Sequence, residues 1–487
     1  MKLRLLVVSG LLALSISVPI VGVIVCSGIL VLQVALICLR PAIAGIPTPA
    51  FRAREKFLHP IFSIHVATHS EPPDLVIRTL RALQDQDWPA EDYEIIVMDN
   101  NTSDPALWGP VKEFCSSCNS KIKFLHQSGV LGAKAGALNI ALDHARPDAS
   151  HVVTVDADYV VGPNFLSAAA SALERTGADY VQFPQSYIGV SGTAAGVDAE
   201  LEEYFRSNAT VADEAEAVLL TGTLCVISKE ALIAAGGWSG TTTTEDAEIG
   251  VRLCNAGFTG RFINQIVGQG LLPLSFADLE KQRYRWCSGN FQTFLRHFQI
   301  IITGRGSLSL HKRLVIISQL TAWFNLALMP AALLFAAMLF GREQSAEAIL
   351  AASVIVLGLS DVVMRIIGRG VRDGLGFSVT CHAIACRIAL APQSAKATFD
   401  ALLGEELKFV VTNKSGSRTR STGRIPLGHL LIFVVALVLI VSVPSANPLV
   451  IAAAFVLMLP LPAALLTDGS LHSYSRAIAT TYREVMV

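Results

Sequence analysis

The clearest candidate for chemistry is the stretch HVVTVDAD at residues 151–158, in which a short apolar run ends in two aspartates. Its valines predict a buried strand. Side chains alternate along a strand, so Asp156 and Asp158 are expected to point the same way at the carboxyl edge of a sheet, where open α/β folds bind ligands. Two carboxylates this close favour a cation, and oxygen ligands beside a phosphate suit Mg²⁺ or Mn²⁺. Taken alone, the motif fits a solvated strand end equally well.

Two further polar motifs lie downstream. The sequence Thr-Glu-Asp at residues 244–246 comes just before a helical run at residues 247–255. A carboxylate there is stabilised by the helix dipole, so a simple N-cap is the alternative. The sequence Gln-Arg-Tyr-Arg-Trp at residues 282–286 combines cations that can hold a pyrophosphate with a flat ring that can stack on a sugar. A basic and aromatic anchor beside a membrane is the other interpretation of this motif.

The segment that carries these motifs alternates strands and helices. Helical patterns include residues 72–87 and 133–145, and a helix is expected from Pro163. This alternation predicts a largely parallel α/β sheet with its acidic strand ends, including Asp99, along one edge. The usual dinucleotide and ATP-binding loops are absent from the sequence. Strands are predicted at residues 61–68, 93–99, 122–126, 151–158 and 179–184.

Composition indicates a membrane protein. Hydrophobic residues make up 52% of the chain and charged residues only 16%, and the apolar excess lies in the first 45 residues and in the last part of the chain. The net charge of −1 argues against a nucleic-acid partner. The nine cysteines are scattered, which suits free thiols in a reducing compartment.

The apolar segments predict about six membrane spans, each needing about 20 residues. Residues 5–39 are interrupted by Pro19 and Gly22, so a hairpin of two short spans is favoured over one tilted span or a signal peptide. Asp361 and Arg365 are spaced to pair within one later span. Residues 365–426 hold ten Lys and Arg against four Asp and Glu, which predicts a cytoplasmic segment, with an interfacial amphipathic helix at 376–391. The later spans are predicted at residues 314–341, 348–367, 427–446 and 448–466.

Taken in order, the motifs resemble the processive family 2 glycosyltransferases, which include cellulose synthase, curdlan-type β-glucan synthases, chitin synthase and hyaluronan synthase. The resemblance covers about residues 60–300. Within that range, LGAKAGALN at residues 131–139 resembles a Lys-Ala-Gly-x-Leu-Asn segment of these enzymes. The resemblance reappears in FVVTNK at residues 409–414, which is similar to the gating loop of cellulose synthase. It implies a GT-A (Rossmann-like) cytosolic catalytic domain at residues 51–305. Membrane regions would lie at residues 1–45 and 306–487, the second with the gating loop near 409–415.

The resemblance also implies roles for individual residues. Asp246, next to Glu245, would be the general base, and Asp158 would bind Mg²⁺ or Mn²⁺. The acceptor would contact Trp286, Gln282, Thr221 and Gly222. The nucleotide-sugar donor would contact Thr68, Glu71, Asp99, Lys134, Asp156, Arg285, Thr412 and Lys414.

The activity that the resemblance implies is the transfer of glucose from UDP-glucose to a growing β-glucan. The donor would react on the cytoplasmic side of the plasma (inner) membrane, and the chain would pass through the surrounding helices and lipid. One departure concerns residues 220–223, which read Leu-Thr-Gly-Thr where cellulose synthases have Phe-Cys-Gly-Ser or Phe-Cys-Gly-Thr. A different sugar or linkage, as in chitin-, hyaluronan- or mannan-like polymers, therefore stays open. So do a transferase that makes a glycolipid and a transporter with an inactive soluble domain.

Overall fold

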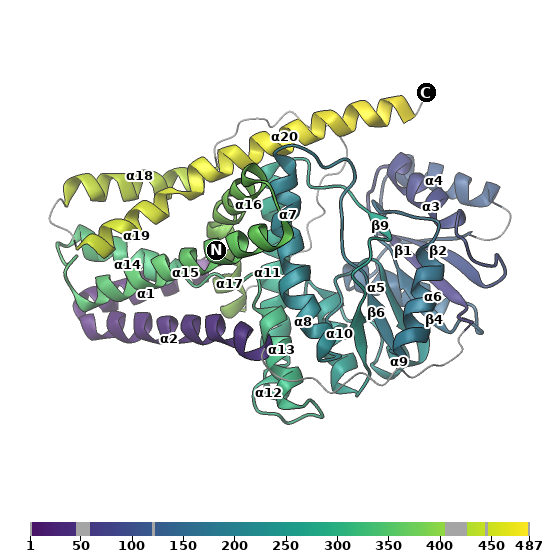
Figure 1. Ribbon diagram of the computed structural model, residues 1–487, viewed down its shortest axis with the longest axis horizontal. Coiled ribbons are helices and arrows are strands. Elements are labelled where there is room, and N and C mark those ends of the chain that lie inside the picture. Colours follow the sequence, from purple (N-terminus) through teal and green to yellow (C-terminus); the bar gives the residue numbers. More distant parts are fainter. Residues whose placement is uncertain (1, 45–58, 119–121, 405–425, 444–446, 486–487) are drawn as a thin grey trace.

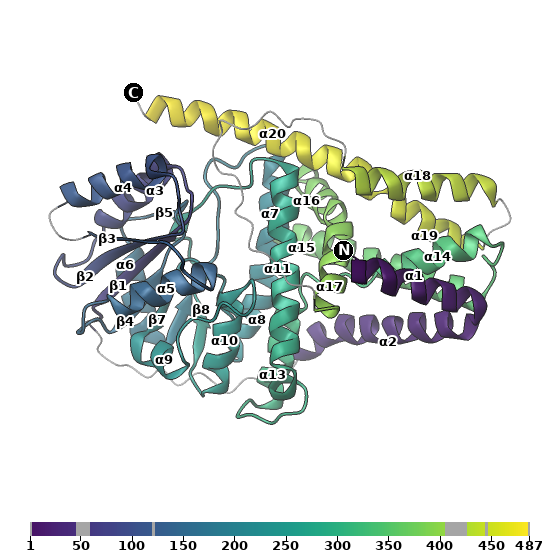
Figure 2. The same cartoon turned by 180° about the vertical axis from the view of Figure 1, so that it is seen from behind.

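The computed structural model describes residues 2–44, 59–118, 122–404, 426–443 and 447–485. Two parts lie side by side along the longest axis of the molecule (Figure 1). One is a sheet with helices packed around it, and the other is a set of long helices that run in similar directions. Seen from behind, α11 (Phe276–Arg296) stands where the two parts meet (Figure 2). The chain thus combines an α/β domain with an α-helical domain, as the sequence predicts.

A seven-stranded sheet of order β3-β2-β1-β4-β7-β6-β8 forms the α/β domain. Neighbouring strands are parallel except at β7, which is antiparallel to both β4 and β6. Every strand predicted from an apolar run is present, whereas β7 and β8 were not predicted. The strands are β1 (Phe62–Thr68), β2 (Tyr93–Asn100), β3 (Ile122–Gln127), β4 (His151–Thr154), β6 (Tyr180–Gln182), β7 (Cys225–Ser228) and β8 (Gly260–Phe262), and β5 (Val160–Val161) pairs with β9 (Gly268–Gln269) separately.

Helices cover both faces of the sheet, which is what buried, apolar parallel strands require. One face packs mainly against α3, α4 and α6, and the other against α5, α9 and α10. Between β6 and β7, a helical segment leads toward the helical domain. The helices are α3 (Pro73–Gln84), α4 (Pro105–Ser117), α5 (Ala133–Asp143), α6 (Phe165–Thr176), α7 (Ala194–Tyr204), the π-helical turn η1 (Phe205–Ala209), α8 (Thr210–Glu214), α9 (Lys229–Ala234) and α10 (Glu245–Asn255).

Strand β4 is shorter than predicted. It ends at Thr154, and the Tyr159 N–H donates to the Asp156 carbonyl (3.1 Å), so the two aspartates belong to a turn. The Asp156 N–H donates to Thr223 Oγ1 (3.0 Å) instead of to a strand neighbour. The prediction that the two aspartates alternate as strand residues is therefore wrong. Both nevertheless lie just beyond the carboxyl end of β4.

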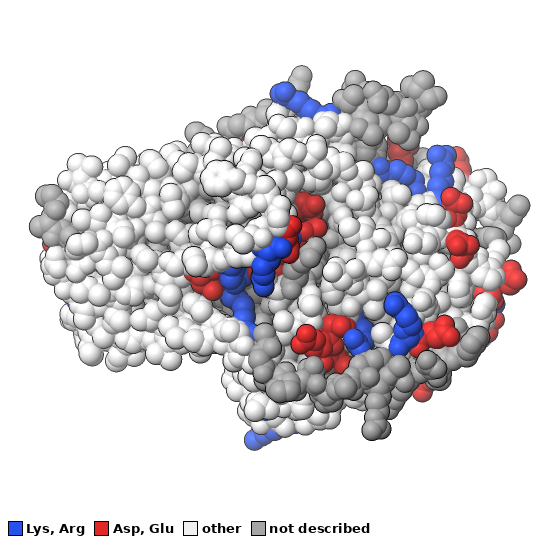
Figure 3. All heavy atoms as spheres, viewed as in Figure 1, with Lys and Arg blue, Asp and Glu red and all other residues white. Residues whose placement is uncertain are grey.

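Among the described residues, three helices are long and apolar enough to cross a membrane: Pro19–Ile43, Ala346–Asp373 and Pro448–Ala479. Three shorter apolar helices accompany them. The surface of this domain in Figure 3 is almost free of Lys, Arg, Asp and Glu, in contrast to the α/β domain. The elements are α1 (Lys2–Ser17), α2 (Pro19–Ala44), α14 (Leu328–Leu339), α15 (Ala346–Asp373), α18 (Leu427–Ser442), α19 (Pro448–Met458) and α20 (Pro460–Val485).

Two predictions for the helical domain have different outcomes. The N-terminal stretch forms two contacting helices, α1 and α2. Pro19–Ile43 is long and apolar enough to cross a membrane and Leu6–Ser17 is shorter, so the hairpin of two spans stays a prediction. The segment 314–341 is not one span, because α13 (Leu310–Leu320) stops and α14 starts only at Leu328. Asn325 lies within this interruption. Its Oδ1 accepts from the Ala327 N–H (2.9 Å), an alternative to helical pairing that Asn side chains readily provide.

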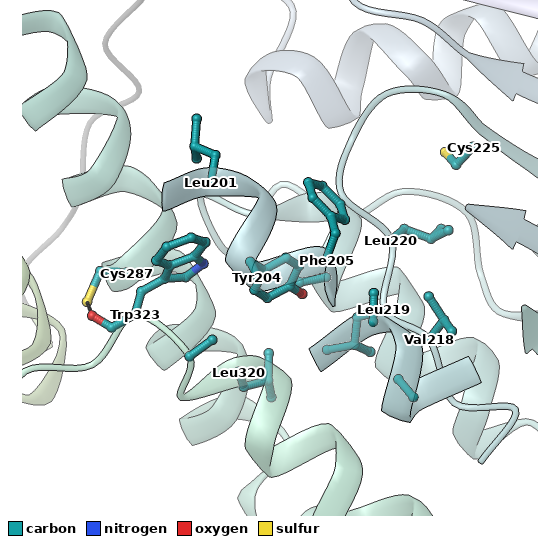
Figure 4. Close-up of a cluster of buried hydrophobic side chains, with 14 of the residues drawn as sticks. Leu201, Tyr204, Phe205, Val218, Leu219, Leu220, Cys225, Cys287, Leu320 and Trp323 are labelled. Atoms are coloured by element: carbon teal, nitrogen blue, oxygen red, sulfur yellow. Dashed lines mark hydrogen bonds between the residues drawn. The ribbon is translucent and has the colours of Figure 1, made fainter. Parts of the chain in front are cut away.

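The two domains share one hydrophobic core. In the cluster of Figure 4, α7 contributes Leu201 and Tyr204, while α13 and the segment after it contribute Leu320 and Trp323. The predicted interfacial helix at 376–391 is α16 (Phe377–Ala389). It packs against α7 and α20, and α17 (Ala391–Leu402) follows it. The interface between the α/β domain and the helical domain is therefore part of a common hydrophobic core. The remaining short helix is α12 (Phe298–Ile301).

Candidate active site

A cavity of about 340 Å³ lies where β1, β2 and β4 end, facing α10 and α11; we call it the main cavity. It gathers side chains that are far apart in the sequence. Their individual roles stay predictions, but their convergence is a property of the fold. Of the predicted site residues, the lining contains Thr68, Glu71, Lys134, Asp156, Asp158, Thr221, Gly222, Glu245, Asp246, Gln282, Arg285 and Trp286.

Lys134 occupies the first turn of α5 and connects several of these groups. Its Nζ donates to Asp156 Oδ1 (2.5 Å) and to the Gly222 carbonyl (2.8 Å), and lies 3.8 Å from Glu245 Oε1. Burial alone would lower the pKa of Lys134, but the carboxylates of Asp156, Glu245 and Asp246 outweigh burial and raise it. The ammonium is therefore a fixed positive charge in the cavity wall.

The turn before α5 explains the glycines around this lysine. A Cβ on Gly136 would lie 2.0 Å from the Leu131 carbonyl oxygen, so only glycine fits at this point of the helix. Gly132, just before the helix, has a φ of +81°. The spacing of glycines in LGAKAGALN is thus what allows the chain to turn sharply and present Lys134 to the cavity.

Asp246 lies in the first turn of α10, and its Oδ1 accepts from the Ala247 N–H (2.7 Å). Burial and the neighbouring Glu245 raise the pKa of Asp246 to about 7, although Lys134 and Arg285 act in the opposite direction. A carboxyl group with a pKa near neutrality is well suited to accept a proton at physiological pH.

Helical spacing divides the Gln-Arg-Tyr-Arg-Trp motif of α11 between two environments. Gln282, Arg285 and Trp286 are three and four residues apart, so they share one helix face, and all three line the main cavity. Arg283 lies outside the lining and is 1% exposed. Its guanidinium donates to both oxygens of Glu200 on α7 (2.9 and 2.6 Å). Only one of the two arginines can therefore meet a ligand in this cavity.

Asp99, at the end of β2, lies behind the cavity wall and not in its lining. The β1–β2 register places Thr68 beside Asp99, and Thr68 Oγ1 donates to Asp99 Oδ2 (2.9 Å). Thr102 Oγ1 donates to the same oxygen and His126 Nδ1 contacts the other, both at 2.9 Å. This carboxylate is thus placed to orient Thr68. Thr412 and Lys414 lie outside the described residues.

Several lining residues were not predicted. His69 follows β1, Asn100 is the last residue of β2 and Asn101 comes next. The polar turn after residue 99 was a usable signal for the two asparagines. Gln185 and Tyr187 follow β6, and the loop 271–274 lines the cavity with apolar side chains. Nothing in the sequence Leu-Leu-Pro-Leu distinguishes that loop from an ordinary buried segment.

The acidic residues at the end of β4 fit a cation that arrives with its ligand. Asp158 is 5% exposed and lines the cavity close to Asp156. Among the described residues, no group of three or more His, Cys, Asp or Glu side chains could hold a metal. Mg²⁺ is commonly held by one or two carboxylates, with phosphate oxygens and water completing its coordination. The donor set therefore suits a cation shared with a diphosphate.

The mixed sheet, the cavity at its carboxyl edge and the apolar helices define a GT-A (Rossmann-like) domain joined to a membrane domain. Two family models match the chain: "Glycosyl transferase family 2" over residues 63–235 and "Glycosyl transferase family group 2" over residues 151–359. Together they match more than half of the sequence. The chain belongs to the family 2 glycosyltransferases, and its curated relatives place it among the cellulose synthase-like members.

Three curated relatives illustrate the range of activities named among the proteins that this chain is similar to. The cellulose synthase catalytic subunit [UDP-forming] of Xanthomonas axonopodis pv. citri is 27% identical over 286 residues, 57% of this chain and 37% of the relative. Glucomannan 4-beta-mannosyltransferase 7 of Arabidopsis thaliana is 27% identical over 47% of this chain and 43% of the relative. Beta-monoglucosyldiacylglycerol synthase of Synechocystis is 26% identical over 50% of this chain and 51% of the relative. The chain thus spans between about a third and a half of these relatives.

A solved structure with the same fold is a mannosyltransferase from Pyrobaculum calidifontis in complex with GDP-Man and Mn²⁺. The match has a TM-score of 0.53 at 15% identity and covers 79% of this chain and 100% of the other. At this identity the likeness shows the fold alone.

Proposed function

We propose that this protein is an inverting, metal-dependent glycosyltransferase that polymerises glucose from UDP-glucose into a β-glucan on the cytoplasmic side of the plasma membrane. The observation that carries the proposal is the meeting of Asp246, Lys134, Asp158 and Trp286 at one cavity next to apolar helices. An acceptor hydroxyl attacks the anomeric carbon and gives its proton to Asp246. As the new C–O bond forms, the sugar–phosphate bond breaks on the opposite face, and UDP leaves.

The fixed cations of the cavity match the charge of this leaving group. Lys134 and Arg285 come from two different sequence motifs and both line the cavity. Both side chains can stabilise the negative charge that develops on a diphosphate leaving group. Thr68, oriented by Asp99, and Glu71 would contact the uridine. Trp286 would stack on the terminal sugar of the acceptor, and Thr412 and Lys414 would close over the donor.

Three buried oxygen atoms give the acceptor a place to hydrogen-bond. Among the described residues, Thr221 Oγ1, Thr244 Oγ1 and Gln282 Oε1 have no hydrogen-bond partner. All three residues line the main cavity, beside Asp246 and Trp286. Buried polar atoms without partners are rare and call for a ligand or water. Sugar hydroxyl groups, which both donate and accept, would satisfy them.

Two further cavities between the main cavity and the apolar helices support export of the product. A small cavity of about 50 Å³, the linking cavity, shares Asp246, Trp286 and Thr221 with the main cavity and ends at Trp323. Trp323 also lines a cavity of about 220 Å³, the membrane cavity, between α2, α14, α15 and α19. Trp286 and Trp323 have ring centroids 5.8 Å apart. Flat rings and polar groups along such a route suit a sugar polymer, which needs an enclosed path through lipid.

A divalent cation is the expected cofactor, held by Asp158 together with the diphosphate. It would supply positive charge to the leaving group. Chelation with EDTA is expected to abolish transfer, and Mg²⁺ or Mn²⁺ to restore it, as measured by release of UDP from purified protein in proteoliposomes. Asp158→Asn should raise the metal concentration needed for half-maximal activity. Full activity in chelator would contradict the role given to Asp158.

The principal alternative is a non-processive transferase that glycosylates a membrane lipid, as the name of the Synechocystis relative describes for that protein. The linking and membrane cavities favour a polymer, because a single transferred sugar needs no route across the helices.

Product size separates the two functions. Purified protein in proteoliposomes should convert labelled UDP-glucose into a long polymer that a β-glucanase degrades. With the catalytic domain facing outward, that polymer should accumulate in the lumen. UDP-N-acetylglucosamine and GDP-mannose, tested side by side, should give little product. A labelled glycolipid of one sugar would overturn the proposal, and a polymer made only from another donor would overturn its choice of glucose.

A further inference from the structure

Helix α20 leaves the membrane domain and runs along the α/β domain (Figure 1). Its first part belongs to the apolar stretch Pro448–Ala479, which is long enough to cross a membrane. The predicted span at 448–466 therefore continues well beyond its predicted end. After residue 466, Leu471, Tyr474 and Ile478 lie on one face of α20. All three side chains are buried, with exposed fractions of 0%, 3% and 7%. One continuous helix thus connects the bilayer to the α/β domain.

The hydroxyl of Tyr474 joins this helix to two loops. It donates to the Ile188 carbonyl (3.0 Å) and accepts from the Leu272 N–H (3.3 Å). The two loops also pair with each other, since the Ile188 N–H donates to the Gly270 carbonyl and the Gly270 N–H donates to the Ser186 carbonyl, both at 2.9 Å. Tyr474 therefore closes a small hydrogen-bonded unit made of residues 186–188 and 270–272.

This unit is a wall of the main cavity. Tyr187 from the first loop and Leu271 and Leu272 from the second line it. A second contact from α20 acts nearby: Asp468 Oδ1 accepts from the Phe276 N–H (3.3 Å) at the start of α11, the helix that carries Arg285. The C-terminal helix thus holds both the wall and the beginning of the helix that presents the predicted diphosphate clamp.

We propose that Tyr474 is a positioning residue for sugar transfer, which holds this wall closed so that water does not compete with the acceptor. The proposal rests on the proposed function. Water can attack the same anomeric carbon as an acceptor hydroxyl: its oxygen forms the new C–O bond, the sugar–phosphate bond breaks, and the proton goes to the base. The products are then glucose and UDP. A firmly held apolar wall disfavours this reaction by excluding water.

The test is Tyr474→Phe in the full-length protein, which keeps the ring packed and removes only the hydroxyl. The ratio of free glucose released to glucose transferred, with UDP-glucose as donor, is expected to rise about tenfold, as loss of a buried hydrogen-bond partner would produce. The matched control is Ser473→Ala, one residue away, whose exposed hydroxyl donates to the Gly469 carbonyl of the same helix. This variant should keep the wild-type ratio.

The ratio separates positioning from stability, because a loss of folded protein lowers both products equally. Backbone hydrogen exchange provides a second measurement that needs no activity. Tyr474→Phe should increase exchange at residues 186–188 and 270–272, and Ser473→Ala should not. An unchanged exchange pattern, or an unchanged ratio in active protein, would overturn the proposal. A wild-type protein without transfer activity would overturn the proposed function, and exchange would still decide the role of Tyr474 in holding the wall.

Discussion

Asp246→Asn is expected to lower the rate of sugar transfer by about 10²- to 10⁴-fold, the range that a positioned general base contributes. The amide has nearly the shape of the carboxyl group but cannot take the proton of the acceptor hydroxyl. The kcat for UDP release in proteoliposomes measures the effect. Asp74→Asn is a matched control, since it also removes a carboxylate from the first turn of a helix, on an exposed part of α3. It should keep wild-type activity. Transfer that survives intact in Asp246→Asn would favour a transporter with an inactive domain.

The pH dependence adds a second signature of Asp246. Its pKa is raised to about 7, mainly by burial, and the base must be ionised to act. In the wild type, kcat/KM should therefore be constant above about pH 7 and fall about tenfold per unit below it. The residual activity of Asp246→Asn should lack this step. A wild-type profile that stays flat down to pH 5 would contradict the assignment of Asp246 as the base.

Gly222→Ala is expected to lower transfer by about 10²-fold, the loss that a small misplacement of a catalytic group can cause. Gly222 has a φ of +84°, and a Cβ there would lie 2.8 Å from Asp246 Oδ2 and 3.4 Å from Lys134 Nζ. The methyl group would push directly on the base. Binding of UDP, measured separately by calorimetry, should change less than kcat, because the uridine contacts proposed for Thr68 and Glu71 lie away from Gly222.

The control for this variant is Gly257→Ala. Gly257 has a φ of +91° but no atom within 4 Å of its would-be Cβ, so alanine there brings similar backbone strain without a clash. Strain of this kind costs roughly 1–2 kcal/mol. Both variants should therefore lose thermal stability, Gly222→Ala at least as much as Gly257→Ala, and only Gly222→Ala should lose transfer. Equal losses of activity would show that strain, and not contact with Asp246, is responsible.

Much of the site could be predicted because many of its charged and aromatic residues lie in short sequence motifs. Asp156 and Asp158 follow a strand, Asp246 lies in the first turn of a helix, and Arg285 and Trp286 share a helix face. The fold brings all of these positions to one cavity. The parallel order of the strands brings such ends to one edge. The α/β fold and these charged and aromatic residues of the cavity follow from local rules, whereas Lys134, Thr221 and Gly222 were predicted from the family resemblance.

What could not be predicted depends on contacts between distant segments. Asp99 ends its strand like the others, but Thr68, Thr102 and His126 engage its carboxylate behind the wall. The apolar stretch around Asn325 looks continuous in hydropathy, and one side-chain hydrogen bond marks where it is interrupted. The antiparallel β7 is short and apolar, and no local pattern gives its direction.

A chain of buried and partly buried ion pairs joins the two domains. Arg283 pairs with Glu200, Arg387 with Glu200 and Glu203, Arg365 with Glu203 and Asp361, and Arg40 with Asp361. The prediction that Asp361 and Arg365 pair is thus confirmed, at 3.2 Å, but as part of a larger network. Burial alone would raise the pKa of Glu203, and the arginines outweigh this and lower it to about 2. A buried carboxylate that loses such partners is strongly destabilising.

This network has a consequence for folding during synthesis, because the partners of its ion pairs are synthesised at different times. Arg365 leaves the ribosome 162 residues after Glu203, its partner on α7. At a translation rate of about 5–20 residues per second, Arg365 is therefore synthesised roughly 10–30 s after Glu203. Helix α7 cannot form this ion pair before then. During that interval Glu203 lacks both of its arginine partners, Arg365 and Arg387. A gene fragment that stops at residue 305 never receives the missing arginines, and we expect it to aggregate when expressed alone.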